Sequence, residues 1–218
     1  MTVTPVVAAI GDVDRRRIAG TAGLHVTWDE LGVDAPGDGR TFRAAFGRGD
    51  ETFRRLDVAS RALVLASEAS GLQDLLTAAQ REASALIVAT TIGCLDADRQ
   101  FAASLDTEMR DAPIFPYTLP STCLGEVALR HGLRGISICL SVAPGDADDA
   151  LGEALRVLVA GEAETAVVAT VDVLRGEPPT CAATVVLLAH PRLALPPVAA
   201  WPAPGGGAFA AIRRALPA

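Results

Sequence analysis

Runs of apolar residues alternate with amphipathic stretches along the chain, and this alternation predicts strands separated by helices. Unbroken apolar runs bounded by turn residues are typical of buried strands. Five such runs predict strands at residues 3–10, 85–91, 135–142, 165–173 and 181–189. Apolar residues at helical spacing predict a helix from Glu51 onward and further helices at 71–82, 96–106, 121–131, 146–161 and 208–216. Helices therefore separate most of the strands, as in an α/β protein.

Glycine and proline mark the segments between these elements. Residues 11–50 show no clear period, and we expect them to be irregular. Three prolines predict a rigid loop at 107–120, after which Ser121 or Thr122 can cap the next helix. Only the turn at 175–179 separates the last two predicted strands. We therefore expect a mostly parallel sheet with helices on both faces and one antiparallel edge.

The composition changes at Pro191, where the regular pattern ends. Proline and alanine dominate from there, and Gly205, Gly206 and Gly207 precede the short helix predicted at the C-terminus. The sequence therefore predicts one folded domain at residues 1–190. A linker with a short helix would then occupy residues 191–218.

Charge and composition exclude several functions. All 19 basic residues are arginine, so a lysine Schiff base, a Walker-type lysine and a pyridoxal phosphate anchor are unavailable, and we expect no cofactor. The net charge of −7 and the absence of a basic run disfavour binding to nucleic acid or to an anionic membrane. No apolar run reaches the ~20 residues of a membrane span, and the N-terminus lacks the basic start of a signal peptide. We therefore expect a cytoplasmic protein.

The cysteines and histidines indicate neither a metal site nor a disulfide framework. The cysteines are far apart, have no C-x-x-C spacing and have no paired histidines nearby, so we expect free thiols. Cys139 lies within a predicted strand and favours core packing, whereas Cys94 and Cys123 should be better exposed. The full set is Cys94, Cys123, Cys139 and Cys181, with histidines at His25, His131 and His190. We expect none of the histidines to act as an acid or base.

Four segments, in this order, resemble the N-terminal half of a β-ketoacyl-acyl carrier protein synthase, a condensing enzyme of the thiolase fold. They are FRRLDVASRALVLASEA at 53–69, ALIVATTIGCLDADRQFAASL at 85–105, IFPYTLPSTCLGEVALRHGLRG at 114–135 and VLVAGEAETAVVATVDV at 157–173. The resemblance implies a thiolase-like half fold, here with five strands in a mostly parallel sheet.

The chain departs from this family at the nucleophile. Counting forward from Gly135 and back from Gly161 both place the family's nucleophilic cysteine at Pro144. The family's Thr-Ala-Cys-Ser-Ser is replaced by Val-Ala-Pro-Gly-Asp at 142–146. Proline has neither a nucleophilic atom nor a backbone N–H for an oxyanion site. The family's two catalytic histidines come from a C-terminal half, which we expect this chain to lack, so we expect no catalytic residues.

Two functions follow from the resemblance. The first is a non-catalytic subunit that pairs with an active ketosynthase, like the chain-length factors of type II polyketide and aryl-polyene pathways, within polyketide or fatty acid biosynthesis. Its partner would be a ketosynthase or a second copy of the chain, with an acyl carrier protein as a further partner. The alternative is a short thiolase-fold acyltransferase or acyl-binding enzyme that uses a relocated cysteine.

The resemblance also implies where such a partner would bind. In the family, the strands equivalent to 135–142 pair edge to edge across the dimer. The expected interface residues are Ile114, Phe115, Tyr117, Ser121, Thr122, Gly135, Ile136, Ile138 and Leu140. The helix at 146–161 keeps a broad apolar stripe, which needs a cover from residues 201–216 or from another chain.

Overall fold

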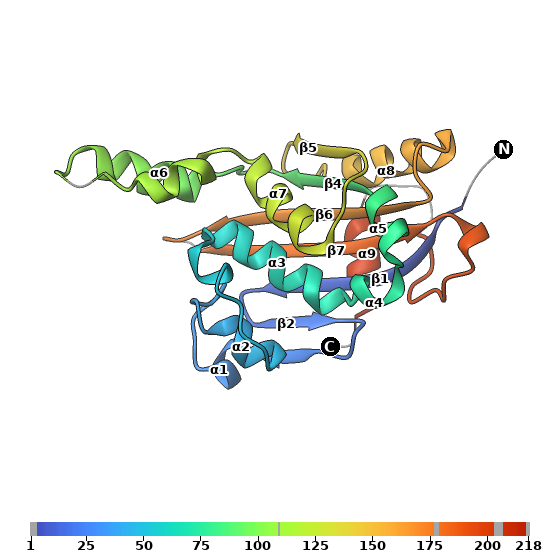
Figure 1. Cartoon of the computed structure of the whole chain (residues 1–218), viewed down its shortest axis with the longest axis horizontal. Helices are drawn as coiled ribbons and strands as arrows, with labels where there is room; N and C mark the ends of the chain where they lie inside the picture. Colours follow the sequence, from blue (N-terminus) through green and yellow to red (C-terminus); the bar gives the residue numbers. More distant parts are fainter. Residues whose placement is uncertain (1–3, 109, 177–178, 203–206, 217–218) are drawn as a thin grey trace.

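The structure, a computed structural model, describes residues 4–108, 110–176, 179–202 and 207–216. Its centre is a seven-stranded sheet in the order β3-β2-β1-β7-β6-β4-β5 (Figure 1). The strands are β1 (Val6–Asp14), β2 (Arg17–Gly20), β3 (His25–Thr27), β4 (Ala85–Thr90), β5 (Ser137–Ser141), β6 (Thr165–Leu174) and β7 (Thr180–Ala189). The α/β class is therefore confirmed, although the sheet has seven strands rather than five.

The expectation of a mostly parallel sheet was wrong. Strand β4 runs parallel to β5 and β6, but the pairs β6–β7, β7–β1, β1–β2 and β2–β3 are antiparallel. The additional strands β2 and β3 are too short to show a period in the sequence, and they lie in the segment predicted to be irregular. Strand β1 also joins the middle of the sheet between β2 and β7, which its position at the start of the chain does not reveal.

Strand β1 continues through Gly11 and Asp12, where the sequence predicted its end. A glycine inside a strand often marks a close approach of another backbone. A Cβ atom at Gly11 would lie 1.8 Å from the carbonyl oxygen of Ala66, and one at Gly20 would lie 1.9 Å from that of Ala69. Both glycines therefore let the sheet lie directly against a helix.

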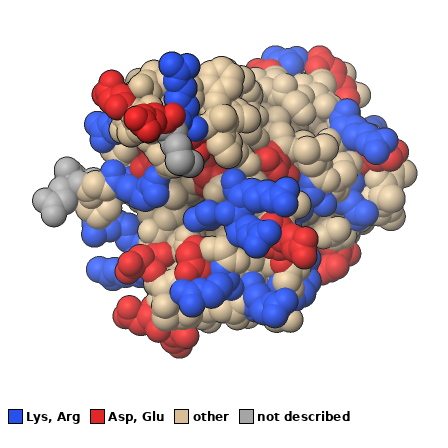
Figure 2. Space-filling view, turned by 60° about the vertical axis from the view of Figure 1, so that its left-hand side comes forward, with Lys and Arg blue, Asp and Glu red and all other residues tan. Residues whose placement is uncertain are grey.

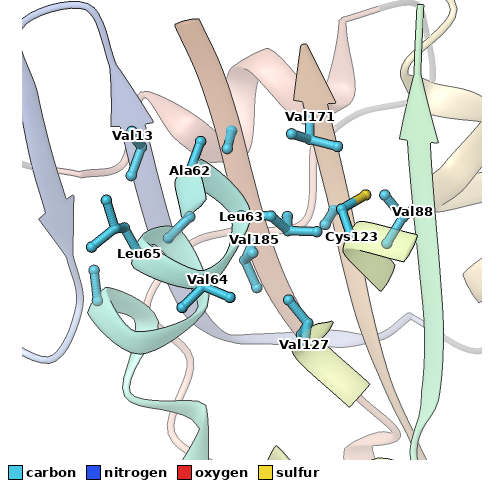
Figure 3. Packing of buried hydrophobic residues seen from close by; sticks show 14 of the residues in the cluster. Val13, Ala62, Leu63, Val64, Leu65, Val88, Cys123, Val127, Val171 and Val185 are labelled. Carbon is cyan, nitrogen blue, oxygen red and sulfur yellow. The ribbon is translucent and has the colours of Figure 1, made fainter. Parts of the chain in front are cut away.

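Helices cover both faces of the sheet, as predicted. Helices α3 (Val58–Ser70) and α7 (Ser121–His131) pack on one face, and α8 (Asp148–Ala160) and α9 (Ala208–Arg213) pack on the other (Figure 1). On the first face, Leu63 of α3 and Val127 of α7 contribute to the same core as Val171 and Val185 of the central strands (Figure 3). The core is thus divided into two layers, one on each side of the sheet.

The remaining helices are short, and several differ from the sequence prediction. They are α1 (Trp28–Leu31), α2 (Thr41–Phe46), η1 (Phe53–Arg55), α4 (Leu72–Leu75), α5 (Ala78–Ala83), α6 (Leu95–Leu105), η2 (Ala112–Thr118) and η3 (Pro191–Leu193). Helix α3 begins at Val58, where Asp57 caps it, rather than at Glu51. The helix predicted at 71–82 is divided into α4 and α5, because Thr77 caps a new helix.

Two predictions about loops also need correction. The proline-rich segment 107–120 contains the 3₁₀ helix η2. Helix α7 then starts after Pro120 with no side-chain cap, so neither Ser121 nor Thr122 caps it. Of the predicted turn at 175–179, residues 177–178 lie outside the described part of the chain, as do Gly205 and Gly206 of the predicted linker.

The C-terminal segment packs on the domain, although its sequence predicted a linker. Val198 donates its backbone N–H to the carbonyl oxygen of Val7 at 2.8 Å, and Ala199 forms an isolated bridge with the same residue. Helix α9 buries Phe209 and Ile212 in the second core layer. The division at residue 190 stays a prediction. No helix in the described part of the chain is long and apolar enough to cross a membrane.

Candidate functional site: the nucleophile position and the β5 edge

Pro144, which the sequence analysis predicts to stand at the family's nucleophile position, lies in the turn between β5 and α8. Pro144 and Gly145 are exposed there, and Gly145 has a φ angle of +99°. The turn is closed by the backbone N–H of Asp146, which donates to the carbonyl oxygen of Ala143 at 3.0 Å. Pro144 provides no nucleophile and no N–H group. This turn therefore has no group that could form an acyl thioester.

The first turn of α8 is acidic, as the sequence predicted, but one of its carboxylates has a partner elsewhere. Asp148 and Asp149 occupy the first turn, and α8 has no side-chain N-cap. The carboxylate of Asp148 accepts hydrogen bonds from the backbone N–H groups of Gly207 and Ala208 at 2.7 and 2.8 Å. Asp148 therefore joins α8 to α9 instead of facing solvent alone.

The cysteines lie in environments that disfavour thiolates. Burial raises the pKa of Cys94 to about 11 and the pKa of Cys123 to about 12. Burial also raises the pKa of Cys181 to about 12 and shifts that of Cys139 upward. Cys123 is buried, which contradicts its predicted exposure, whereas Cys94 is partly exposed and donates its S–H to the carbonyl oxygen of Thr118 at 2.9 Å. Thiols in such sites are weak nucleophiles at neutral pH.

The histidines are separated in the fold. His131 ends α7 and is buried, with its Nε2 atom 2.9 Å from the hydroxyl oxygen of Ser67 in α3. Burial, assisted by nearby arginines, lowers the pKa of His131 to about 3. His25 lies in β3, and His190 follows β7. Within the described residues, no group of His, Cys, Asp and Glu side chains could hold a metal ion.

Strand β5 forms one edge of the sheet, so half of its backbone groups lack a strand partner. Leu86 donates its N–H to the carbonyl oxygen of Ile136 at 2.7 Å, and Val142 donates to Thr90 at 3.0 Å. The even-numbered residues of this parallel pair therefore bond to β4. It follows that Ser137, Cys139 and Ser141 direct their N–H and C=O groups away from the sheet.

This geometry assigns different roles to the residues predicted on this strand. The side chains of Ile136, Ile138 and Leu140 pack against the second core layer, and their backbone groups face β4. Gly135 is required by a close contact, because a Cβ atom there would lie 2.4 Å from the carbonyl oxygen of Ser84. The groups available for edge pairing thus belong to the odd-numbered residues, which the sequence analysis did not select.

Apolar side chains are exposed on the segment that precedes β5. Large exposed hydrophobic residues of the described chain include Leu105 of α6, Phe115 of η2, Leu119 just after η2, and Leu129 of α7. Phe115 is 59% exposed although its ring packs against Phe101, with 5.3 Å between the centroids. Helix α7 packs beside β4 and β5. The exposed apolar groups therefore lie on or next to α6, η2 and α7, the elements that precede β5 in the chain.

The other interface residues predicted in this segment differ in exposure. Ile114 is buried, and Tyr117 is partly buried, with its hydroxyl 3.4 Å from a carboxylate oxygen of Glu126. Ser121 is exposed, whereas Thr122 donates its hydroxyl to the carbonyl oxygen of Pro116 at 2.5 Å. Phe115 and Ser121 are thus accessible to a partner, while Ile114 supports the segment from inside.

Arginines and acidic residues are interspersed on the face of the molecule that Figure 2 shows. A cavity of about 220 Å³ is lined by Arg55, Arg61 and Arg175, together with Asp57 and Asp111. Arg175 is bound by the carboxylate of Asp96, with Nη2 2.8 Å from Oδ2. The Nε atom of Arg61 is buried without a hydrogen-bond partner. This cavity and its rim, here called the arginine-rich end, therefore bring three guanidinium groups together, of which that of Arg175 is paired with Asp96.

The comparisons with known proteins identify the class to which this fold and site belong. Residues 12–187 match the family described as β-ketoacyl synthase, N-terminal domain. The chain therefore belongs to the ketosynthase family through its N-terminal domain, which confirms the resemblance found in the sequence. No curated protein matches the sequence.

Solved structures share the fold at low sequence identity. The ishigamide ketosynthase/chain length factor aligns with a TM-score of 0.67 and 19% identity, covering 89% of this chain and 64% of that chain. The ketosynthase ApeO in complex with its chain length factor ApeC, from Xenorhabdus doucetiae, aligns with a TM-score of 0.59 and 17% identity, covering 87% and 79%. The complex of AntDE with the acyl carrier protein AntF aligns with a TM-score of 0.65 and 18% identity, covering 89% of this chain and 65% of that chain. The chain thus spans less than two thirds of the first of these neighbours.

Proposed function

We propose that this protein is a non-catalytic ketosynthase-like subunit that pairs with an active ketosynthase in polyketide, aryl-polyene or fatty acid biosynthesis. The observation that carries the proposal is the open β5 edge next to a turn in which Pro144 replaces the nucleophile. Ketosynthase/chain length factor pairs among the structural neighbours support the same arrangement.

The β5 edge can supply both affinity and register to such a contact. Three residues direct unpaired N–H and C=O groups outward, which is what an antiparallel partner strand requires. The exposed side chains of Phe115 and Leu119 would add apolar contact area from the segment that precedes α7. Edge pairing alone is weak, so these apolar residues would provide most of the stability of the complex.

The raised thiol pKa values oppose the alternative enzyme with a relocated cysteine. Each of the four thiols would be almost entirely protonated at neutral pH, with desolvation by burial as the largest cause. The carboxylate of Asp98, which accepts a hydrogen bond from Cys94 at 3.3 Å, raises the pKa of this thiol further instead of activating it.

A proline substitution on β5 tests the proposed contact. Ser141→Pro removes an N–H that points away from β4, so β4–β5 pairing should survive while a partner strand loses a donor. Each variant is co-expressed with a tagged active ketosynthase from the same organism, and the joint complex is measured by size exclusion with light scattering. We expect Ser141→Pro to reduce the joint complex at least about tenfold, consistent with a lost hydrogen bond and local strain.

Ser141→Thr is the matched control, because threonine keeps the outward N–H and favours strands. It should retain the complex. The proposal fails if wild-type protein forms no joint complex, or if Ser141→Pro and Ser141→Thr behave alike.

An acyl carrier protein is the further partner that the arginine-rich end would fit. Arg55 and Arg61 line a cavity of about 220 Å³, large enough for a phosphate group with part of an attached chain. A carrier protein bears its acyl group on a phosphopantetheine arm, whose phosphate would complement these guanidinium groups. The acyl carrier protein complex among the structural neighbours supports this assignment.

A further inference from the structure

The C-terminal segment is held on the second face of the sheet by three carboxylates. Here the name C-terminal lid denotes residues 198–202 and 207–216. The carboxylate of Asp148 accepts the backbone N–H groups of Gly207, Ala208 and Phe209 at 2.7 to 2.8 Å. At the other end of α9, Arg213 places Nε 2.7 Å from Oδ1 of Asp12 and Nη2 3.0 Å from Oδ2 of Asp14. Both ends of this short helix are thus fixed by charge.

Apolar contacts fill the space between these polar anchors. Phe209, Ile212 and Leu216 are almost completely buried, and they belong to the same core layer as Val7, Ile10 and Leu188 of the sheet. Trp201 packs against this layer as well. The lid therefore covers apolar surface of the central strands that α8 does not cover.

The buried carboxylate of Asp12 depends on the C-terminal lid for its ion-pair partner. Its side chain is 2% exposed and lies in a central strand, where an unpaired carboxylate would be strongly unfavourable. In the described part of the chain, Arg213 is the cation that pairs with it, and Thr184 donates a hydroxyl to the same oxygen at 2.7 Å. The buried carboxylate of Asp12 therefore keeps its ion pair only while α9 is docked with Arg213 in this position.

We infer that the C-terminal lid acts as a latch. Its polar anchors hold α9 in place, and the docked lid prevents the second face of the sheet from associating with other protein surfaces. The three carboxylates select a short helix with free N–H groups at its start and an arginine near its end, and the chain supplies that helix itself. Release of the latch would expose a continuous apolar face and leave three carboxylates without their partners on α9. Association would then occur through this face as well as through the β5 edge.

The latch is tested in the full chain, without a ketosynthase, so the result does not depend on the proposed function. The double variant Asp148→Ala/Arg213→Ala removes both polar anchors. The control Asp149→Ala/Arg214→Ala removes the same charges from exposed neighbouring positions, for which the structure gives no contact between α8 and α9. Hydrogen exchange is followed by mass spectrometry for α9 and for β6–β7. Binding of a hydrophobic dye and size exclusion with light scattering report on the exposed face.

We expect α9 of the double variant to exchange about ten- to a hundredfold faster, as the loss of charge-assisted hydrogen bonds implies. The exchange of β6 and β7 should stay slow, dye binding should rise, and larger species should form. The control should match the wild type in every measurement. Unchanged exchange in α9, equal acceleration in α9 and β6–β7, or faster α9 exchange without dye binding or association would each overturn the inference.

Discussion

Pro144 lies on the surface of the molecule, at the start of an acidic helix turn. A thiol at the beginning of a helix is activated where the positive end of the helix dipole lowers its pKa. Here Asp146, Asp148 and Asp149 add negative charge around that position. Asp148 is also bound to α9, so its position is fixed by the fold. The carboxylates around position 144 would therefore oppose a thiolate at that position.

A cysteine at this position should not restore activity. We expect Pro144→Cys to be folded and to show no thioester exchange beyond that of an ordinary exposed cysteine, because each nearby carboxylate opposes the thiolate by roughly 0.3–1 kcal/mol. Intact-mass measurement after incubation with an acyl thioester gives the readout, with peptide mapping to separate the four native thiols. The control Ala143→Cys places a thiol one residue earlier. Acylation of Pro144→Cys much faster than of this control would contradict the prediction.

His131 makes stability depend on pH. Its pKa is about 3 in the folded protein, against an ordinary value of 6.5, with burial as the main cause. Because a depressed pKa means that the folded state binds fewer protons than the unfolded state, stability should fall as pH decreases from about 6.5 to about 3. Protonation would place a charge between α3 and α7, next to Arg130.

His131→Gln should weaken this dependence, since glutamine can keep the hydrogen bond to Ser67 without taking up a proton. Denaturant unfolding at a series of pH values should give a slope smaller by up to about 1.4 kcal/mol per pH unit within that range. Comparison with the wild type cancels the contributions of the carboxylates. The same substitution at His190, which lies outside the α3–α7 interface, controls for the loss of a histidine. A parallel pH profile for His131→Gln would show that His131 does not titrate in this way.

At the scale of elements, two glycines determine how closely the sheet and α3 approach. Gly11 of β1 and Gly20 of β2 each lie against a carbonyl oxygen of α3, so close that a Cβ atom at either position would clash with that oxygen. Gly152, in the middle of α8, has open space where its Cβ would lie. Packing therefore requires glycine at positions 11 and 20 of the strands. It does not require glycine at position 152, on the exposed side of α8.

Alanine at these glycines should have opposite effects. Gly11→Ala should lower the free energy of unfolding by about 3 kcal/mol or more, since backbone atoms of α3 would have to move. Gly152→Ala should raise it by about 0.5–1 kcal/mol, because alanine restricts the unfolded chain and fits the helix. Chemical denaturation of both variants measures the two changes. Equal effects of the two substitutions would mean that the close approach of β1 and α3 is not required.

The whole molecule has surfaces of different character. One side of the sheet ends in the open edge of β5, exposed apolar residues lie on or next to the elements that precede this strand, and the arginine-rich end forms a cavity. The second face is closed by the C-terminal lid. The cavity of the arginine-rich end is lined by Pro113 and Ile114 of η2, so it adjoins the segment that carries Phe115.

Carrier protein binding, if it uses the arginine-rich end, should depend on salt and on Arg55. We expect Arg55→Glu to bind a phosphopantetheine-bearing carrier protein with a several-fold weaker affinity, because the substitution reverses a charge in the cavity. The wild type should bind more weakly at about 0.5 M than at about 0.1 M salt, because salt screens exposed charges. Fluorescence anisotropy of the labelled carrier protein measures both. Arg134→Glu makes the same charge change at an exposed surface ion pair with Glu82 and should bind normally. Equal loss in both variants would point to net charge rather than to this cavity.

The local pattern of apolar and polar residues was sufficient to predict some elements of this protein, because the features that specify them lie within a few consecutive residues. The unbroken apolar runs that became β4, β6 and β7 are long enough to require burial on both faces. The register of the nucleophile position also follows from local landmarks, Gly135 and Gly161, on either side of Pro144. Where the pattern is short, as in β2 and β3, no period can develop and the sequence predicted irregular structure.

The sequence by itself thus determined the family, the α/β class and the main buried strands, and it predicts that Pro144 stands at the nucleophile position. Only the tertiary structure decided the order and direction of the strands, which backbone groups of β5 face outward, and why Gly11 interrupts an apolar run without ending it. It also decided the role of Asp148, which contacts an N–H group 59 residues away in the chain. Strand pairing, close backbone approach and the partner of a buried charge depend on groups distant in sequence, and a local pattern carries no record of which distant groups will meet.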